Sequence, residues 1–235
     1  MSAPSIPRLT RRRSRSTGIL VLLGLLGLLT GCATTKPMGL SEALGGLAES
    51  KEAVAVFSLR TVNQHKPGYQ PKVSHVFVWE DGKEKREKYS FTVDDPYRQG
   101  KDEFNEYLVS LRLPPGKYML REFFGSAGTF PIRGMFGAPI YTRFELTPGT
   151  IVYFGHIEAT IRQRTSDDQL RAGSLIPLID QAVTGLSGGT FEIQISDNYE
   201  NDLVAFRERY PGLVGASIER AILPPWSSPS EDAMK

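Results

Sequence analysis

Apolar and polar residues alternate along much of the chain between residues 52 and 196. The alternation is clearest over residues 107–113, where every second position is apolar, and it recurs at 89–93, 142–146 and 191–195. Because successive side chains of a β-strand point to opposite faces, this period predicts strands that each bury one face.

Short turn motifs separate these segments. Pro-Gly pairs end at Gly116 and Gly149, and an Asp-Gly pair ends at Gly82. Proline presets φ for the first turn position and glycine accepts a positive φ, so each pair predicts a tight turn between neighbouring strands. About seven strands with turns at such short intervals are typical of an antiparallel β-sandwich, so we predict a mainly β fold of this kind for residues 52–196.

Two stretches inside this region depart from the strand pattern. Residues 125–139 contain four glycines among apolar residues, which predicts a long loop. Long loops in compact domains often carry function. Residues 175–183 have apolar positions at the spacing of a short helix.

The C-terminal part of the chain has helical features, and we predict a small helical extension over residues 197–224. Asp197 and Glu200 have the spacing of a capping box, and a Pro-Gly pair after residue 210 ends this first helix. Apolar positions between residues 213 and 222 predict a second helix. Residues 225–235 are expected to form a disordered tail.

The N-terminal segment has a different pattern. Residues 1–17 contain five arginines and no acidic residue, and residues 19–29 are apolar or glycine throughout. A membrane-spanning helix needs about 20 apolar residues, so this run is too short to cross a bilayer. A basic region, an apolar region and a small-residue cleavage site in this order predict a signal peptide over residues 1–31.

The segment Leu29-Thr30-Gly31-Cys32 resembles the lipobox of bacterial lipoproteins at all four positions. The resemblance implies transfer of diacylglycerol to the Cys32 sulfur, cleavage between Gly31 and Cys32, and acylation of the new amino terminus by a fatty acid such as palmitate. Residues 32–51 would then be a lipidated N-terminus and tether. Ala33, rather than aspartate, implies sorting to the outer membrane, with the protein facing the periplasm.

Removal of the signal peptide changes the charge of the protein. The whole chain has 28 basic and 26 acidic residues, for a net charge of +2. Without the five arginines of residues 1–31, there remain 23 basic and 26 acidic residues, a net charge of −3. The remaining chain is mildly acidic, which argues against a nucleic-acid-binding protein. Its one cysteine also excludes an intramolecular disulfide.

Two Pro-Gly hairpins provide a second resemblance. The segments LRLPPGKYML (111–120) and FELTPGTIVYF (144–154) are similar to hairpins of transthyretin-like sandwich domains. Such domains occur in carboxypeptidase regulatory modules and in envelope lipoproteins. The resemblance implies a binding or scaffolding module, and it transfers no catalytic residue.

Few residues of the sequence have the spacing of a catalytic or metal-binding motif. The three histidines, His65, His75 and His156, include no pair at metal-ligand spacing, so we expect no metal and no cofactor. Ser126 lies in Gly-Ser-Ala-Gly, which is not the spacing of a nucleophile elbow. A periplasmic hydrolase or metal-dependent enzyme built from His75 or His156 with nearby acids stays an alternative.

Aromatic and apolar side chains gather around the two hairpins and the glycine-rich stretch. Some of them could line a groove for a partner or an apolar ligand. We predict a ligand or partner surface formed by Phe123, Phe124, Phe130, Met135, Phe136 and Tyr141.

The sequence therefore favours a membrane-anchored envelope lipoprotein that contacts lipid through acylated Cys32 and an envelope protein through its sandwich. A carrier of a lipid or another small apolar ligand is a further alternative.

Overall fold

The computed structural model describes residues 34–40, 51–82, 88–100, 103–174 and 179–229. The chain divides into two units, residues 1–33 and 34–235. The first unit, which includes the predicted signal peptide and Cys32, lies outside the described residues. No helix among the described residues is long and apolar enough to span a membrane.

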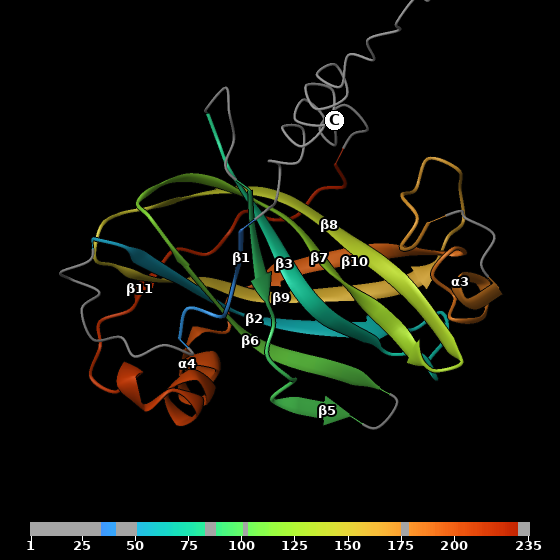
Figure 1. Ribbon diagram of the computed structural model, residues 1–235, viewed down its shortest axis with the longest axis horizontal. Coiled ribbons are helices and arrows are strands. Elements are labelled where there is room, and N and C mark those ends of the chain that lie inside the picture. Colours follow the sequence, from blue (N-terminus) through green and yellow to red (C-terminus); the bar gives the residue numbers. More distant parts are fainter. Residues whose placement is uncertain (1–33, 41–50, 83–87, 101–102, 175–178, 230–235) are drawn as a thin grey trace, which may run out of the picture. The chain divides into compact units, whose positions relative to one another are not determined.

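The second unit is mainly β, and its strands form two packed sheets (Figure 1). Sheet A contains, in spatial order, β1 (Thr34–Lys36), β4 (Lys88–Thr92), β3 (Pro71–Glu80), β7 (Gly116–Thr129) and β8 (Ile132–Leu146). Sheet B contains β10 (Gly189–Ser196), β9 (Ile151–Gln163), β2 (Ala53–Asn63), β6 (Phe104–Leu113) and β5 (Arg98–Gly100), and β11 (Glu219–Arg220) pairs with β9. The predicted two-sheet β fold is confirmed.

Among the described strands, most neighbours are antiparallel, but three pairs are parallel. These are β1 with β4, β11 with β9, and the central pair of sheet B, β2 with β9. Parallel neighbours cannot be joined by a tight hairpin, and β2 and β9 are accordingly far apart in the sequence. The Pro-Gly pairs end strands as predicted, but the hairpins expected there do not form. They join β6 to β7 and β8 to β9, and in each case the two strands belong to different sheets.

Apolar side chains from the facing sides of the two sheets fill the core. Phe57, Tyr107, Phe123 and Phe136 are fully buried there. A second, smaller apolar cluster lies on the outer side of sheet B, where the helix α4 (Tyr199–Arg209) packs through Leu203 and Phe206 against β2 and β9. Sheet B is therefore apolar on both faces, and sheet A is covered on its inner face.

The glycine-rich stretch 125–139 is not a loop, because it forms the ends of β7 and β8 and the hairpin between them. Gly128 has a φ of +86° near the turn, whereas Gly134 is needed for close packing. A Cβ on Gly134 would lie 2.4 Å from Gln181 Oε1 and 2.5 Å from Thr184 Oγ1. Gln181 belongs to α3 (Ile179–Val183), so a small residue in the strand lets α3 approach this edge.

The free edge of β8 is covered by the segment that connects β9 to β10. The Gly137 amide donates to the Ala172 carbonyl at 3.2 Å, and Gln181 Nε2 donates to the Met135 carbonyl at 2.9 Å. These bonds satisfy backbone groups that would otherwise form an open edge able to pair with another chain.

The C-terminal region differs from its prediction beyond the first helix. The helix expected from Asp197 is α4, and Asp197 Oδ1 accepts from the first helical amide, that of Tyr199, at 3.1 Å. A second helix over residues 213–222 does not form. A short 3-10 turn, η1 (Pro211–Leu213), leads into an extended segment that bonds to β9, with the Leu223 amide donating to Phe154 O at 3.0 Å. That edge of β9 is free because β10 begins to pair only at His156.

Both predicted flexible ends contribute to the folded unit. Within the predicted tether, Thr34–Lys36 pairs with β4, and the Met38 side chain is fully buried in the core. Within the predicted tail, Trp226 packs against the core, and its Nε1 donates to the Pro139 carbonyl at 2.9 Å. Apolar side chains at Met38 and Trp226 explain why both segments adhere to the sandwich.

Candidate functional site

The residues of the predicted partner surface lie on opposite faces of sheet A, because successive side chains of a strand point to opposite faces. Phe123 on β7 and Phe136 on β8 point into the core, so they are not surface residues. Phe124, Met135 and Tyr141 belong to the same two strands and are half-buried or exposed on the outer face of sheet A. The prediction failed for the first two because a loop was expected, and a loop does not impose the alternation of a strand.

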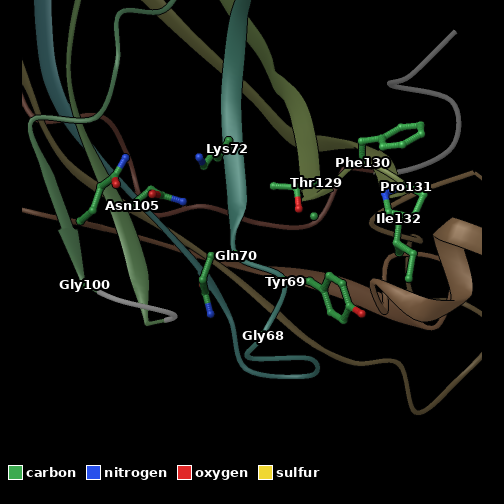
Figure 2. A pocket seen from close by; sticks show the side chains of 12 residues that line it. Gly68, Tyr69, Gln70, Lys72, Gly100, Asn105, Thr129, Phe130, Pro131 and Ile132 are labelled. Carbon is green, nitrogen blue, oxygen red and sulfur yellow. The ribbon is translucent and has the colours of Figure 1, made fainter.

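Phe130 is the sixth predicted residue and lies at the tip of the β7–β8 hairpin, where its side chain is 95% exposed. The tip borders a hollow of about 640 Å³. The other walls come from the loop between β2 and β3 and from the strands β5 and β6. Figure 2 shows Asn105 on one side of the hollow, Tyr69 and the hairpin tip on the other, and Lys72 between them.

The loop between β2 and β3 is fixed by hydrogen bonds, so this wall of the hollow is formed before any ligand binds. Gln70 Oε1 accepts from the Asn63 amide at 2.9 Å, and Asn63 Nδ2 donates to the Tyr69 carbonyl at 2.8 Å. Asn105 Nδ2 donates to the Pro71 carbonyl at 2.9 Å, which joins the loop to β6. Preformed walls lower the entropic cost of binding.

The described residues that line the hollow carry amide, hydroxyl, aromatic and ammonium groups but no carboxylate. Lys72 is exposed and forms no ion pair with a described residue. Thr129 and Gln99 add polar groups, and Phe130 with Pro131 adds apolar surface at the rim. This combination suits a ligand or protein segment that presents apolar and neutral or anionic groups together.

A row of aromatic and cationic side chains crosses the outer face of sheet A, and we call it the aromatic–cation row. It consists of Lys88 on β4, Trp79 on β3, Arg121 on β7 and Tyr141 on β8. Lys88 Nζ lies 4.8 Å and Arg121 Cζ 3.7 Å from the centre of the Trp79 ring, and Arg121 Cζ lies 5.4 Å from the centre of the Tyr141 ring. Such cation–π contacts order the row.

Backbone irregularities position the row. Relative to β3, Arg121 is an extra residue in β7, between Leu120 and Glu122. On the other side of β7, Arg121 lies opposite two residues of β8, Ile140 and Tyr141, and Tyr141 has a φ of +48°. A positive φ in a residue other than glycine costs free energy, and such residues occur often at functional positions. The bulge brings the Arg121 guanidinium beside both rings.

Further aromatic side chains continue from the row along the same face. The rings of His75 and Phe77 stack at 6.1 Å, and Phe77 meets Phe124 edge-on at 6.1 Å. Phe124 and Met135 also line an open groove of about 540 Å³ beside α3. In the part of the chain that the structure describes, α3 packs mainly against the edge strand β8 of this sheet, and α4 packs on sheet B.

A half-buried carboxylate, that of Glu122, lies beside the row. Burial raises the pKa of Glu122, and the neighbouring Arg121 guanidinium, 3.9 Å away, opposes this effect. The raised pKa means that the ionised form of Glu122 is less favourable in the folded protein than in water. A cation bound on this face would relieve that cost.

A buried polar cluster connects α4 to sheet B, and sequence reasoning missed it. Asp202 of α4 accepts hydrogen bonds at Oδ2 from the hydroxyls of Ser58 and Tyr153, the latter at 2.6 Å, and at Oδ1 from Asn198 Nδ2 at 2.7 Å. His156 Nδ1 lies 2.6 Å from Ser58 Oγ. The three residue types of a catalytic triad thus meet without a recognisable sequence motif.

The geometry of this cluster differs from that of a nucleophilic site. Ser58 is 1% exposed, so a substrate has no access to its hydroxyl. That hydroxyl donates to the Asp202 carboxylate, whereas an activated serine donates to the histidine. Burial and the Asp202 carboxylate raise the pKa of Tyr153, which keeps its phenol protonated as a donor. The cluster therefore holds α4 on the sheet.

The histidines of the enzyme alternative do not converge. His75 lies on the outer face of sheet A, and His156 lies on the outer face of sheet B beneath α4. Within the described residues, no group of three or more His, Cys, Asp or Glu side chains could hold a metal ion.

Sequence reasoning also missed Trp79, Lys88 and Arg121. A usable signal was present in β3, where His75, Phe77 and Trp79 occupy alternate positions and are all aromatic. Val76 and Val78 form the other, buried face of the same strand.

Comparisons with protein-family models, curated proteins and solved structures find no match for this chain.

Proposed function

We propose that this protein is a lipid-anchored lipoprotein of the bacterial envelope, attached to the outer membrane and facing the periplasm, whose sandwich binds an envelope partner. The lipobox and the preceding basic and apolar regions support the anchor. The preformed hollow and the exposed Phe130 at its rim support the binding role.

The observation that carries the proposal is the distance along sheet A between β1 and the hollow. Thr34 pairs with Tyr89, which in turn pairs with Val78 of β3. Lys72, which lines the hollow, precedes Val78 by six residues on the same strand, a separation of about 20 Å. In an anchored protein, β1 would follow acylated Cys32 after Ala33 alone, and the hollow would lie at the far end of the sheet from the anchor.

The anchor is tested on the full chain expressed in a bacterium with an inner and an outer membrane. We expect incorporation of an alkyne-labelled palmitate and a diacylglyceryl-cysteine amino terminus at Cys32 in mass spectra of the purified protein. The Cys32→Ala variant is expected to lose both. An unmodified Cys32 thiol in the unprocessed wild-type chain would refute the anchor.

The binding role is tested by photo-crosslinking in intact cells. A photoreactive residue in place of Phe130 is expected to crosslink one envelope protein reproducibly. The matched control places the same residue at Thr147, an exposed turn position at the opposite end of β8. Equal crosslinking from both positions, or none from position 130, would contradict binding at the hollow.

A further inference from the structure

The outer face of sheet A presents half-exposed aromatic rings to the surroundings of the protein. Trp79, Phe77, Phe124 and Tyr141 lie there, while α4 covers the equivalent face of sheet B. Tryptophan and tyrosine combine an apolar ring with a polar group, which makes them the aromatic residues enriched where a bilayer meets water. The face therefore has the composition of a surface that rests on lipid headgroups.

The charges on this face favour an anionic surface. The cations on and beside this face are those of Lys88, Lys117, Arg121 and Arg143. The carboxylates are those of Glu122, Glu145 and Asp81, the last paired with Arg143 at 2.7 Å. Residues 32–235 as a whole have 23 basic and 26 acidic side chains. Basic side chains are thus in excess on this face, although acidic side chains are in excess overall. Lys88 and Arg121 also lie against the Trp79 ring, so cation and aromatic group would meet a headgroup together.

The path of the chain restricts how far this face can lie from an anchoring membrane. Thr34 begins β1, and two peptide units separate it from Cys32, a reach of about 7 Å. Trp79 pairs with Lys88 on the strand beside β1, so it lies two strands from β1, about 10 Å across the sheet. Acyl chains on Cys32 would therefore hold the row within a short distance of the bilayer surface.

We propose that the aromatic–cation row of sheet A docks on the anionic phospholipid surface of the membrane that holds Cys32. This inference rests on the proposed lipid anchor. Lys88 and Arg121 bind lipid phosphates, and the Trp79 and Tyr141 rings enter the headgroup region. The domain then lies with sheet A toward the bilayer, and the hollow opens along the membrane plane, where it can reach a partner in the same membrane.

The chain contains two tryptophans, Trp79 and Trp226, which provides an internal reporter. Lipidated full-length protein with Trp226→Phe is reconstituted into vesicles whose lipids carry bromine atoms at a known acyl depth. We expect strong quenching of Trp79 fluorescence in phosphatidylglycerol vesicles and weak quenching in phosphatidylcholine vesicles. The reciprocal Trp79→Phe variant leaves Trp226, bonded to Pro139 on the edge strand, and is expected to show little quenching in either.

Charge variants test the cation contribution in the same vesicles. A basic side chain near an anionic surface contributes about a fivefold change in membrane partitioning, so Lys88→Gln in the Trp226→Phe background should lower the docked population about fivefold. The matched control is Arg207→Gln on α4, an exposed cation on the covered side of the protein, which should leave quenching unchanged.

Three results would overturn the inference, and each is distinct. Acylated protein whose Trp79 is not quenched in phosphatidylglycerol refutes docking and leaves the anchor intact. Shielding of Trp79 that depends on protein concentration rather than on lipid charge would assign the face to a second copy of the chain. A mass spectrum of the same sample that shows unmodified Cys32 would refute the anchor and the docking together.

Discussion

Replacing Tyr153 with phenylalanine removes a single hydroxyl from the polar cluster beneath α4. The ring is fully buried, and its hydroxyl donates to Asp202 Oδ2 at 2.6 Å. Phenylalanine fills the same space, so the variant creates no apolar cavity and leaves the carboxylate with one donor fewer. A hydrogen bond to a charged group contributes about 1.5–3 kcal/mol to stability. For a domain of this size, that loss lowers the melting temperature by about 3–12 °C.

The matched control is Tyr199→Phe, at the start of α4. The Tyr199 hydroxyl donates to the carbonyl of Ile218 at 2.8 Å in a half-buried position. A neutral hydrogen bond contributes about 0.5–1.5 kcal/mol, so this variant should lose about half as much stability. Urea unfolding of both purified variants, followed by circular dichroism, measures the difference. A loss for Tyr153→Phe no larger than that for Tyr199→Phe would refute the claim that the carboxylate cluster holds the helix.

The Ser58→Ala variant extends the same reasoning. Ser58 and Tyr153 donate to the same carboxylate oxygen, so removing both leaves Oδ2 of Asp202 without either partner. Residues that share a partner have non-additive effects, with coupling energies of about 0.5–3 kcal/mol. We expect the double variant to deviate from the sum of the single variants, as measured by the same unfolding assay. Additive effects would indicate that the two hydroxyls act independently.

Four further predictions concern other parts of the molecule. Burial raises the pKa of Tyr107 to about 12 and also raises that of Tyr153. Above pH 10.0, the ordinary pKa of tyrosine, the unfolded state loses both phenolic protons while the native state keeps them. The unfolding free energy should therefore fall by about 2.7 kcal/mol per pH unit above pH 10, less in a Tyr107→Phe variant, as measured by urea unfolding. Because burial raises the pKa of Glu122, the folded protein loses stability as the pH rises and this carboxyl group ionises. Glutamine carries no charge, so Glu122→Gln should raise the melting temperature at pH 7 but not below pH 4. Gly134→Ala should cost about 1–3 kcal/mol in urea unfolding, because its Cβ would meet the amide group carried by α3. Phe130→Ser should change the unfolding free energy by less than about 0.5 kcal/mol while abolishing the partner crosslink of a photoreactive residue at a neighbouring rim position.

The two-sheet fold could be predicted because its strands obey a local rule. Tyr107, Val109 and Leu111 alternate with polar or less buried neighbours, and the Pro-Gly pairs mark where strands end. The parallel pairing of β2 with β9 could not be predicted in this way. It joins residues about a hundred positions apart, such as Val54 and Ile151, and local patterns contain no information about such pairs.

Tertiary contacts also overrode local signals at two places. The glycines of residues 125–139 resemble a loop in sequence, yet Gly134 is small because Gln181 and Thr184 occupy the space where a side chain would lie. The apolar spacing of residues 213–222 resembles a helix, yet from Glu219 onward the chain extends along β9, where a free strand edge offers backbone hydrogen bonds. In both cases the deciding partner is distant in sequence.

The location of the candidate surfaces depended on which face of each sheet is covered. In β3 both faces are apolar, since Val76 and Val78 alternate with Phe77 and Trp79. Periodicity identifies two faces of such a strand but does not say which one another element covers. That depends on where α4 packs, and α4 packs on sheet B because Leu203 and Phe206 meet the apolar outer face of that sheet.

The half-exposed rings of sheet A support the docking that we propose for this face. Each square ångström of apolar surface removed from water contributes about 25 cal/mol, so Phe77, Trp79 and Phe124 would stabilise the protein further if an element covered them. Polar side chains at these positions would keep the same strands without exposing rings to water. The chain instead places Arg121 and Lys88 against the Trp79 ring, which orders the surface without burying it. An ordered but uncovered apolar surface is the arrangement expected of a docking face, and its cations favour an anionic partner.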